Sequence, residues 1–228
     1  MTVTAIIASA GRGRRMASDV AKQFLELHGA PILVHTLKKF DKNPDVDNII
    51  LVAPANAVDF LKMELVEKFR ISKVSKIVVG GNSRQQSVWN GLKNMPLETT
   101  LVAIHDGVRP FVTSEEISRV IAAAEEEGAA VLAVPVKDTV KIVRSGKIES
   151  TPDRERIWLA QTPQVFRKEI IIDAYRLAME KKFSGTDDAS LVEKLGVSVS
   201  IVEGSYSNIK ITTPEDLDFA EIILQKMR

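Results

Sequence analysis

Short runs of valine, isoleucine and leucine alternate with segments of helical period along the whole chain. The apolar runs predict strands at Val3–Ala8, Asn48–Ala53, Lys76–Val79, Leu101–His105, Ala130–Val134, Val197–Val202 and Asn208–Ile211. Between them, apolar side chains recur every three or four residues, as at Leu33, Leu37 and Phe40. Strands that alternate with helices predict an α/β fold, with a mostly parallel sheet and helices on both faces. In such sheets, ligands bind beyond the carboxyl ends of the strands.

Two helices carry clear boundary signals. Thr113-x-x-Glu116 forms a capping box, which predicts a helix that begins there and ends at Gly128. Thr213-Pro214, followed by two acidic residues, predicts the start of the last helix, because proline suits the first helical position and carboxylates suit the first turn.

Residues 139–149 break the alternation of strands and helices. Apolar and charged residues alternate there on both sides of Ser145-Gly146, which predicts a β-hairpin with a two-residue turn. One face of this hairpin would carry Val140, Ile142 and Ile148, and a second subunit could cover it. The alternative is that the hairpin folds back on its own sheet.

Composition and charge limit the possible functions. The 228 residues are 45% apolar and 27% charged, which is ordinary for a globular protein, and they contain no internal repeat or long linker. We therefore expect one domain over residues 1–228, with residues 137–157 as a dimerisation arm. The formal net charge of +1 argues against nucleic acid as a partner.

The residue types that are missing narrow the chemistry further. The chain has no cysteine, which excludes disulfides and thiol catalysis, and its three histidines lack zinc-ligand spacing. No apolar run approaches the ~18 residues that cross a membrane. We expect a cytoplasmic protein with no membrane partner.

The loop after the first strand carries the clearest candidate chemistry. Gly11 and Gly13 allow backbone N–H groups to approach a ligand, and three arginines between positions 12 and 15, followed by Lys22, surround the turn with positive charge. Such a loop suits a triphosphate. It matches neither the dinucleotide fingerprint nor a P-loop. The alternative is a surface turn, against which the crowding of like charges argues.

Two later strands also end in polar segments. The segment 80–87 is rich in small polar residues that could hold a base and ribose, or it is an ordinary helix-capping turn. Asp106 follows the fourth strand, where a carboxylate near phosphates would help to hold Mg²⁺. The alternative is that Asp106 pairs with Arg109 or caps a turn. Asp187 and Asp188, after Thr186, could form a helix start or a polar lip of the site; the helix start is favoured, although Thr186 can serve in both.

These groups together favour nucleotidyl transfer. Arginine, lysine and one carboxylate, with no evident base, suit a reaction in which the attacking group is already a phosphate anion. Arg15, Lys22 and Lys210 would then share the neutralisation of charge at the α-phosphate.

A set of short motifs, in order along nearly the whole chain, resembles that of a known family. The motifs are Ser9-Ala10-Gly11-x-Gly13-x-Arg15-Met16, Lys22-Gln23, Gly80-Gly81-x-x-Arg84-x-x-Ser87, His105-Asp106-x-x-Arg109-Pro110, Asp138-Thr139, Thr162-Pro163-Gln164, Thr186-Asp187-x-Ala189-Ser190 and Asn208-Ile209-Lys210. They resemble the 2-C-methyl-D-erythritol 4-phosphate cytidylyltransferases of the non-mevalonate isoprenoid pathway.

The resemblance implies a Rossmann-like twisted sheet of the nucleotide-diphospho-sugar transferase type, with a hairpin arm that makes a homodimer. It implies transfer of CMP from CTP to methylerythritol phosphate with Mg²⁺, releasing pyrophosphate. For catalysis it implies Arg15 and Lys22, beside the Lys210 already inferred from the residues. For CTP it implies Ala10, Gly11, Gly13, Gly81, Asn82, Ser87 and Asp106, the last also for the metal. For the sugar-alcohol phosphate it implies Arg109, Thr139, Arg154, Thr186 and Lys210, with Thr139 and Arg154 placed to act in the neighbouring subunit.

Two other functions compete with this one. A ribitol 5-phosphate cytidylyltransferase of the same fold would share the glycine loop and the Asp106 turn. A non-catalytic nucleotide-binding module would bind CTP and release no pyrophosphate.

Overall fold

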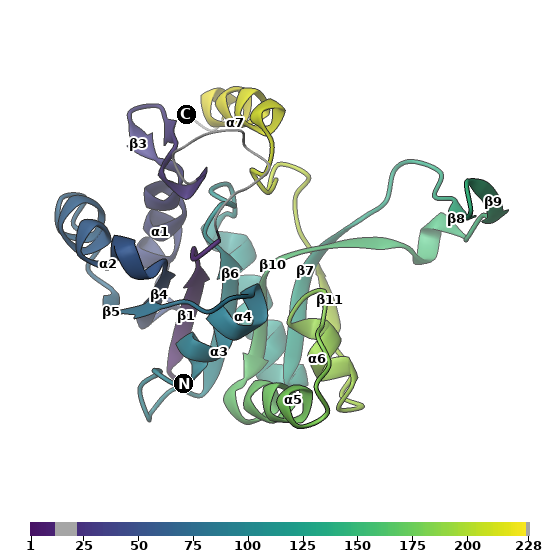
Figure 1. Cartoon of the computed structure of the whole chain (residues 1–228), viewed down its shortest axis with the longest axis horizontal. Helices are drawn as coiled ribbons and strands as arrows, with labels where there is room; N and C mark the ends of the chain where they lie inside the picture. Colours follow the sequence, from purple (N-terminus) through teal and green to yellow (C-terminus); the bar gives the residue numbers. More distant parts are fainter. Residues whose placement is uncertain (12–21, 227–228) are drawn as a thin grey trace.

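A seven-stranded sheet forms the centre of the molecule in the computed structural model, which describes residues 1–11 and 22–226 (Figure 1). Its strand order is β11-β7-β10-β6-β1-β4-β5. The strands are β1 (Val3–Ala8), β4 (Asn48–Ala53), β5 (Val74–Val79), β6 (Leu101–Asp106), β7 (Ala129–Pro135), β10 (Trp158–Arg167) and β11 (Ser200–Glu203). Within this sheet, β10 alone runs antiparallel to its neighbours. The mostly parallel α/β fold is therefore confirmed.

Two helical layers cover the sheet because its strands bury side chains on both faces. One layer consists of α1 (Ile32–Lys42), α2 (Val58–Phe60) with the π-helical η3 (Leu61–Glu67), and α4 (Ser114–Glu127). The other consists of α3 (Arg84–Leu92), α5 (Lys168–Glu180) and α6 (Ala189–Glu193). Successive residues of β1 alternate between the layers, with Ile7 on the first and Ile6 on the second.

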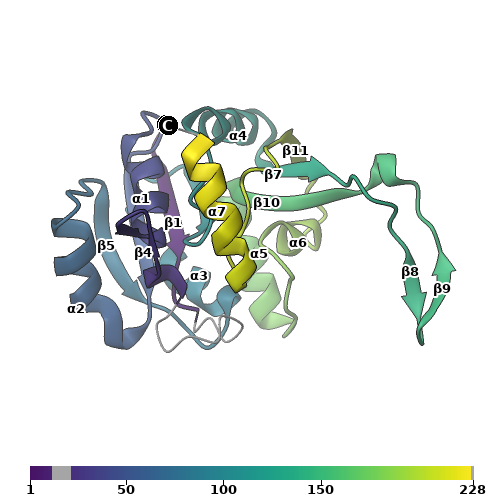
Figure 2. The ribbon, with the colours of Figure 1, turned by 90° about the horizontal axis from the view of Figure 1, so that it is seen from above.

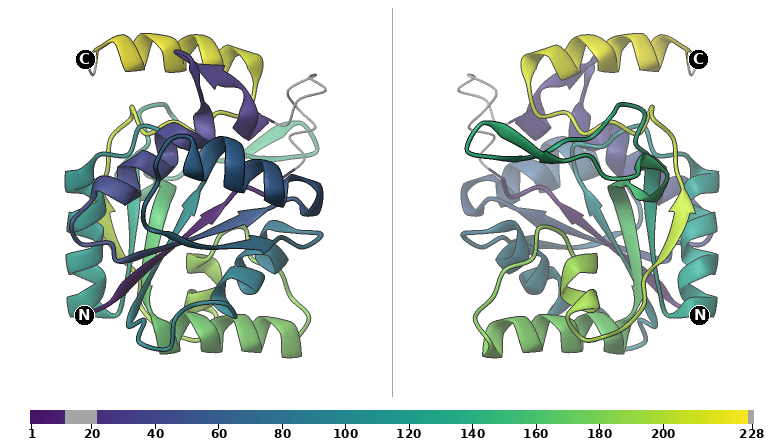
Figure 3. Two further views of the ribbon diagram at one scale, coloured as in Figure 1. Left: turned by 90° about the vertical axis from the view of Figure 1, so that its left-hand side faces the viewer. Right: turned by 90° about the vertical axis from the view of Figure 1, so that its right-hand side faces the viewer.

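The carboxyl ends of the parallel strands lie below a third, smaller cluster of buried apolar residues, separate from those on the two faces of the sheet. The hairpin of β2 (Glu26–Leu27) and β3 (Ala30–Pro31) and the last helix, α7 (Pro214–Lys226), sit above them (Figure 3). Leu27, Phe111 and Ile211 are buried in this cluster. Short 3₁₀ turns complete the structure at η1 (Lys22–Phe24), η2 (Ala55–Ala57) and η4 (Arg154–Arg156).

Local signals in the sequence produce the elements they predicted. The Thr113 hydroxyl accepts a hydrogen bond from Glu116 N, and the Glu116 carboxylate accepts one from Thr113 N, which completes the capping box of α4. That helix ends at Gly128, whose φ of 90° is left-handed.

The hairpin of β8 (Ile142–Arg144) and β9 (Lys147–Ser150) projects from the body of the protein (Figures 1 and 2). Ser145 and Gly146 both have positive φ, as a tight two-residue hairpin turn requires. The two strands form a sheet of their own, and Ile148 is 64% exposed. In this chain the hairpin therefore does not fold back on the main sheet.

Two sequence-based expectations about strands were wrong or incomplete. Residues 208–211 form no strand: Ile211 donates its N–H to Val108 O and is buried beneath α7, so its apolar character reflects that packing. Strand β10 was not predicted, because polar residues and Pro163 interrupt its apolar pattern. An irregularity between Ala160 and Gln164 accommodates this interruption.

The structure has no helix, within residues 1–11 and 22–226, that is long and apolar enough to cross a membrane.

Candidate active site

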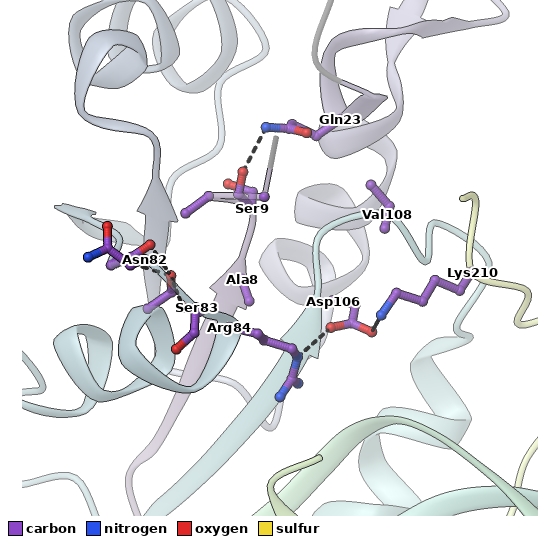
Figure 4. Close-up of a pocket in the computed structure, with 13 residues that line it drawn as sticks. Ala8, Ser9, Gln23, Asn82, Ser83, Arg84, Asp106, Val108 and Lys210 are labelled. Carbon is purple, nitrogen blue, oxygen red and sulfur yellow. Dashed lines mark hydrogen bonds and ion pairs between the residues drawn. The ribbon is translucent and has the colours of Figure 1, made fainter. Parts of the chain in front are cut away.

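A cavity of about 630 Å³ opens at the carboxyl ends of β1, β5 and β6 (Figure 4). Three segments that follow these strands line it, together with Gln23 and Lys210 from elsewhere in the chain. The lining residues are Ala8, Ser9, Ala10, Gly11, Gln23, Gly81, Asn82, Ser83, Arg84, Ser87, Asp106, Val108 and Lys210. The structure thus brings together six of the residues predicted for CTP, namely Ala10, Gly11, Gly81, Asn82, Ser87 and Asp106.

The segment after β1 leaves the sheet through a fixed turn. Ser9 donates its hydroxyl to Val52 O at 2.7 Å, and the buried Gln23 side chain donates to Ser9 O at 2.8 Å. Lys22 is the first residue of η1 and adjoins Gln23. The predicted residues Gly13 and Arg15 lie outside the described part of the chain, as does the side chain of Lys22.

The segment after β5 is both a cavity wall and a helix cap. The Ser83 hydroxyl accepts from Gln86 N at the start of α3, and the Ser87 hydroxyl accepts from Gly81 N, each at 3.0 Å. A Cβ atom at Gly80 would lie 2.3 Å from the Cβ of Ala10, so glycine lets this turn meet the one after β1. The capping interpretation is therefore correct, and it is compatible with a binding role.

Asp106 is the charged centre of the site. Arg84 Nε donates to its Oδ1 at 3.0 Å, and on Oδ2 Lys210 Nζ lies at 2.8 Å and Arg109 Nε at 3.7 Å. Figure 4 shows Arg84 and Lys210 reaching this carboxylate from opposite sides. Burial alone would raise the pKa of Asp106, but the charges of Arg84, Lys210 and Arg109 hold it well below its ordinary value. The pairing with Arg109, which was the alternative to a metal role, is present, and Asp106 is a carboxylate that holds three cations in place.

His105 orients the turn that carries Asp106. Burial lowers the pKa of His105 to about 4, so the ring is neutral at pH 7. Its Nε2–H donates to Arg109 O at 3.0 Å, and its Nδ1 accepts the Thr162 hydroxyl at 3.0 Å. Thr162 Oγ1 also accepts from Asp106 N at 3.1 Å. Thr162 was not predicted as a site residue, although it belongs to a motif quoted for the resemblance.

A second cavity, of about 140 Å³, adjoins the first and shares Arg84, Asp106 and Lys210 with it. Its other lining residues are Arg109, Ala160, Gln161, Thr162, Gln164, Thr186 and Asp187. Arg109, Thr186 and Lys210, all predicted for the sugar-alcohol phosphate, therefore meet here. Arg109 Nε is buried and has no hydrogen-bond partner in the described residues, although it lies 3.7 Å from Asp106 Oδ2.

Thr139 and Arg154 lie elsewhere. Both are exposed at the base of the projecting hairpin, and Arg154 Nη1 donates to Lys137 O at 3.4 Å. Neither lines either of the two cavities described above.

The residues of the larger cavity fit Mg²⁺ only in part. Mg²⁺ is usually bound by one or two carboxylates together with phosphate oxygens. Asp106 supplies one carboxylate, but both of its oxygens contact cationic nitrogens. The described residues contain no cluster of three or more His, Cys, Asp or Glu side chains that could hold a metal. The site therefore suits an ion held chiefly by phosphates.

The fold and the site together define a class of protein. A mostly parallel α/β sheet with a cation-rich cavity at the carboxyl ends of its strands is a nucleotide-binding fold of the Rossmann-like type. The family model described as "IspD: 2-C-methyl-D-erythritol 4-phosphate cytidylyltransferase" matches residues 3–226. The chain belongs to this family.

Curated relatives and solved structures agree with that assignment. The "2-C-methyl-D-erythritol 4-phosphate cytidylyltransferase" of Syntrophus aciditrophicus (strain SB) is 51% identical, over 98% of this chain and 96% of the relative. The protein of that name from Geobacter metallireducens is 50% identical, over 99% of each chain.

The solved structures share the whole fold. The 4-diphosphocytidyl-2C-methyl-D-erythritol synthase of Anaerococcus prevotii DSM 20548 superimposes with a TM-score of 0.87 at 36% identity, covering 98% of this chain and 96% of that one. The cytidylyltransferase of Thermus thermophilus gives 0.81 at 33% identity, covering 99% and 100%. The resemblance drawn from the motifs is confirmed.

Proposed function

We propose that this protein transfers CMP from CTP to 2-C-methyl-D-erythritol 4-phosphate, giving 4-diphosphocytidyl-2-C-methyl-D-erythritol and pyrophosphate. The observation that carries the proposal is the pair of adjoining cavities, one large enough for a nucleotide and one of phosphate size, which share Arg84, Asp106 and Lys210. Relatives about 50% identical carry the name of this activity. The competing acceptor and the binding-only module have no comparable support.

The larger cavity would hold CTP. Gly81, Asn82 and Ser87 form a wall of small polar groups suited to a base and ribose, and Ala10 and Gly11 begin the loop that would bind the triphosphate. Gly13 would complete that loop. Arg15 and Lys22 would stabilise the negative charge that develops at the α-phosphate in the transition state.

The smaller cavity would hold the phosphate of the acceptor beside Arg109, Thr186 and Lys210. That phosphate is already an anion, so no base is needed to remove a proton before it attacks the α-phosphate of CTP. The state of His105 is consistent with a reaction that needs no base, because this side chain is buried, neutral and hydrogen-bonded to Thr162 and Arg109. As the anions arrive, Lys210 would leave Asp106 and pair with phosphate oxygens, which offer it more negative charge.

Asp106 would contribute the one carboxylate of the cavity lining as a ligand for Mg²⁺, and the phosphates of CTP would supply others. When bound, the ion would withdraw electron density from the phosphates and neutralise the leaving pyrophosphate. The protein itself holds Arg84, Arg109 and Lys210 around the same region. Their positive charges would neutralise the phosphates whether or not the Asp106 carboxylate contacts the metal.

The projecting hairpin would join two chains in a homodimer. Ile142, Val143 and Ile148 are exposed apolar residues on it, and such a surface favours a protein contact. Residues 137–157 would then place Thr139 and Arg154 in the partner's acceptor cavity, which explains why they lie away from their own. With no cysteine and a biosynthetic activity, we place the protein in the cytoplasm.

Pyrophosphate release tests the proposal. Purified protein with CTP and Mg²⁺ is given either methylerythritol 4-phosphate or ribitol 5-phosphate, and CTP binding is measured separately by calorimetry. We expect release with the first acceptor alone. Release with ribitol 5-phosphate alone would assign a different acceptor, and CTP binding without release from either would support the binding-only module.

A further inference from the structure

The three cations around Asp106 differ in what else holds them. Lys210 makes no ion pair with another carboxylate among the described residues, and Arg109 is additionally fixed by a hydrogen bond from Nη1 to Asn208 O at 2.7 Å. Arg84 has a second carboxylate behind it, because its Nη2 lies 2.8 Å from Asp188 Oδ2. Arg84 therefore bridges two carboxylates, whereas Lys210 depends on one.

Asp188 is itself held rigidly. It is 1% exposed and occupies the N-cap position of α6, where its N–H donates to Gln164 Oε1 on β10. The Tyr175 hydroxyl, from α5, donates to Asp188 Oδ1 at 2.5 Å. Burial, followed by the charge of Asp188, raises the pKa of Tyr175 well above its ordinary value, so this hydroxyl remains a donor. Three elements of the fold thus hold one buried carboxylate against Arg84.

Stability alone is a poor explanation for this arrangement. Burying ions carries a desolvation penalty that their attraction often fails to exceed, and well-packed apolar residues frequently stabilise a core as much. Tyr175 lies stacked on Trp89, with ring centroids 5.9 Å apart, among apolar side chains of the core. A series of polar contacts runs from this core to the wall of the cavity. Its role is therefore to be sought at the cavity.

We propose that Asp188 is a positioning residue for the transfer reaction, acting through Arg84 on Asp106. By holding the Arg84 guanidinium in place, it keeps the Asp106 carboxylate fixed when Lys210 leaves for the substrate phosphates. It also keeps Arg84 from turning into the larger cavity, which Arg84 lines and where its N–H groups would bind CTP phosphates in the ground state. This inference rests on the proposed function.

The test compares Asp188→Asn with wild type in pyrophosphate release, using CTP and methylerythritol 4-phosphate, and in CTP binding by calorimetry. Asparagine has the size of aspartate but no charge. We expect kcat to fall about tenfold to a hundredfold, as misplacement of a site group commonly produces. CTP affinity should be unchanged or higher, because the site loses one negative charge. Asp173→Asn, on the outer face of α5 where the side chain is 61% exposed, is the matched control and should retain wild-type kinetics.

A second variant makes the outcome independent of whether Asp188→Asn folds. Arg84→Lys keeps the positive charge, but one ammonium group cannot reproduce the guanidinium fork that spans both carboxylates. We expect the same loss in kcat with CTP affinity within about threefold of wild type.

Distinct results would overturn distinct claims. If the wild type is active and Asp188→Asn has the same kcat, the role of Asp188 is refuted. If Asp188→Asn does not fold, an unchanged kcat in Arg84→Lys refutes it instead. Weakened CTP binding that matches the loss of rate would instead make Arg84 a direct ligand of the nucleotide. An inactive wild type refutes the proposed function itself.

Discussion

The side chain of Gln164 on β10 makes four hydrogen bonds, one to Gln161 O in the same strand at 3.4 Å and three to residues 187–189 at the wall of the smaller cavity. Its Oε1 accepts from the N–H groups of Asp188 and Ala189, and its Nε2 donates to Asp187 Oδ2 at 2.8 Å. Asp187 Oδ1 in turn accepts from Ser190 N. Replacing Gln164 by glutamate preserves shape and both accepted bonds, but it places a second carboxylate oxygen where the amide donor was.

The structure sets the size of the effect. Two carboxylate oxygens 2.8 Å apart would repel by about 6 kcal/mol at an effective dielectric constant of about 20. The two carboxylates avoid part of this repulsion when one of them binds a proton, because the protonated oxygen can again donate a hydrogen bond. For a glutamate of ordinary pKa, taking up that proton at pH 7 costs about 4 kcal/mol. Proton uptake therefore limits the loss in free energy of unfolding caused by Gln164→Glu to about 4 kcal/mol at pH 7.

The sign of the pH dependence follows from this proton. The folded variant has a carboxyl pKa raised above the unfolded value, so the penalty is absent below about pH 4 and grows as pH rises. Between that pH and the raised pKa, the free energy of unfolding should fall relative to wild type by about 1.4 kcal/mol per pH unit. Urea unfolding of both proteins at pH 5, 6 and 7 measures this slope. Subtracting the wild-type free energies removes the pH dependence that comes from groups common to both proteins, such as His105.

A charge exchange provides the matched control. In the double variant Gln164→Glu with Asp187→Asn, the asparagine amide donates to the new carboxylate while its oxygen still accepts from Ser190 N. The net charge equals that of wild type, and we expect the pH-dependent penalty to disappear. A single variant that unfolds like wild type at every pH would refute the reasoning, as would a double variant with the same slope as the single one.

Four further predictions concern the loop, the arm and one helix end. Lys22→Ala and Arg15→Ala should lower kcat more than CTP affinity in steady-state and binding measurements, because both would act in the transition state; equal losses would make them ground-state phosphate ligands. Arg154→Ala should mainly raise the KM for the acceptor, and unchanged acceptor kinetics would remove the arm from the site. Deletion of residues 139–152 should give monomers by sedimentation, whereas a surviving dimer would assign the interface elsewhere. Gly128→Ala should lower the free energy of unfolding by about 1 kcal/mol, since φ is 90° there and the new Cβ would lie 3.0 Å from Ile170; a change below about 0.3 kcal/mol would contradict the strain.

Much of the candidate site could be predicted because parallel strands present their carboxyl ends at one edge of the sheet. Residues that follow three predicted strands, such as Ala10, Gly81 and Asp106, indeed line one cavity. Lys210 was predicted by its chemistry and its motif, although the segment that carries it is not the expected strand. The contact of Lys210 with Asp106 depends on the path of the chain beneath α7, which residue spacing does not encode.

The polar partners that hold the site residues escaped prediction. Arg84, Thr162, Gln164 and Asp188 each act through a hydrogen bond or ion pair to a residue distant in sequence. Three of them occurred in motifs that supported the resemblance, but a motif alone does not reveal which atoms meet. Strand β10 was missed for a related reason, since the polar side chains that organise the site also interrupt its apolar pattern.

The sequence by itself determined the local elements of this protein. The local signals are the continuous apolar runs of β1 and β4, the capping box at Thr113 and the turn at Ser145-Gly146. They depend on interactions within a few residues, so the same residues produce them wherever they lie. Only the tertiary structure decided that an antiparallel strand enters between β6 and β7, and that three cations and a second carboxylate converge around Asp106. The physical reason is that burial of charge is favourable only when partners from several elements meet in one place, and the packing of those elements sets where that place is.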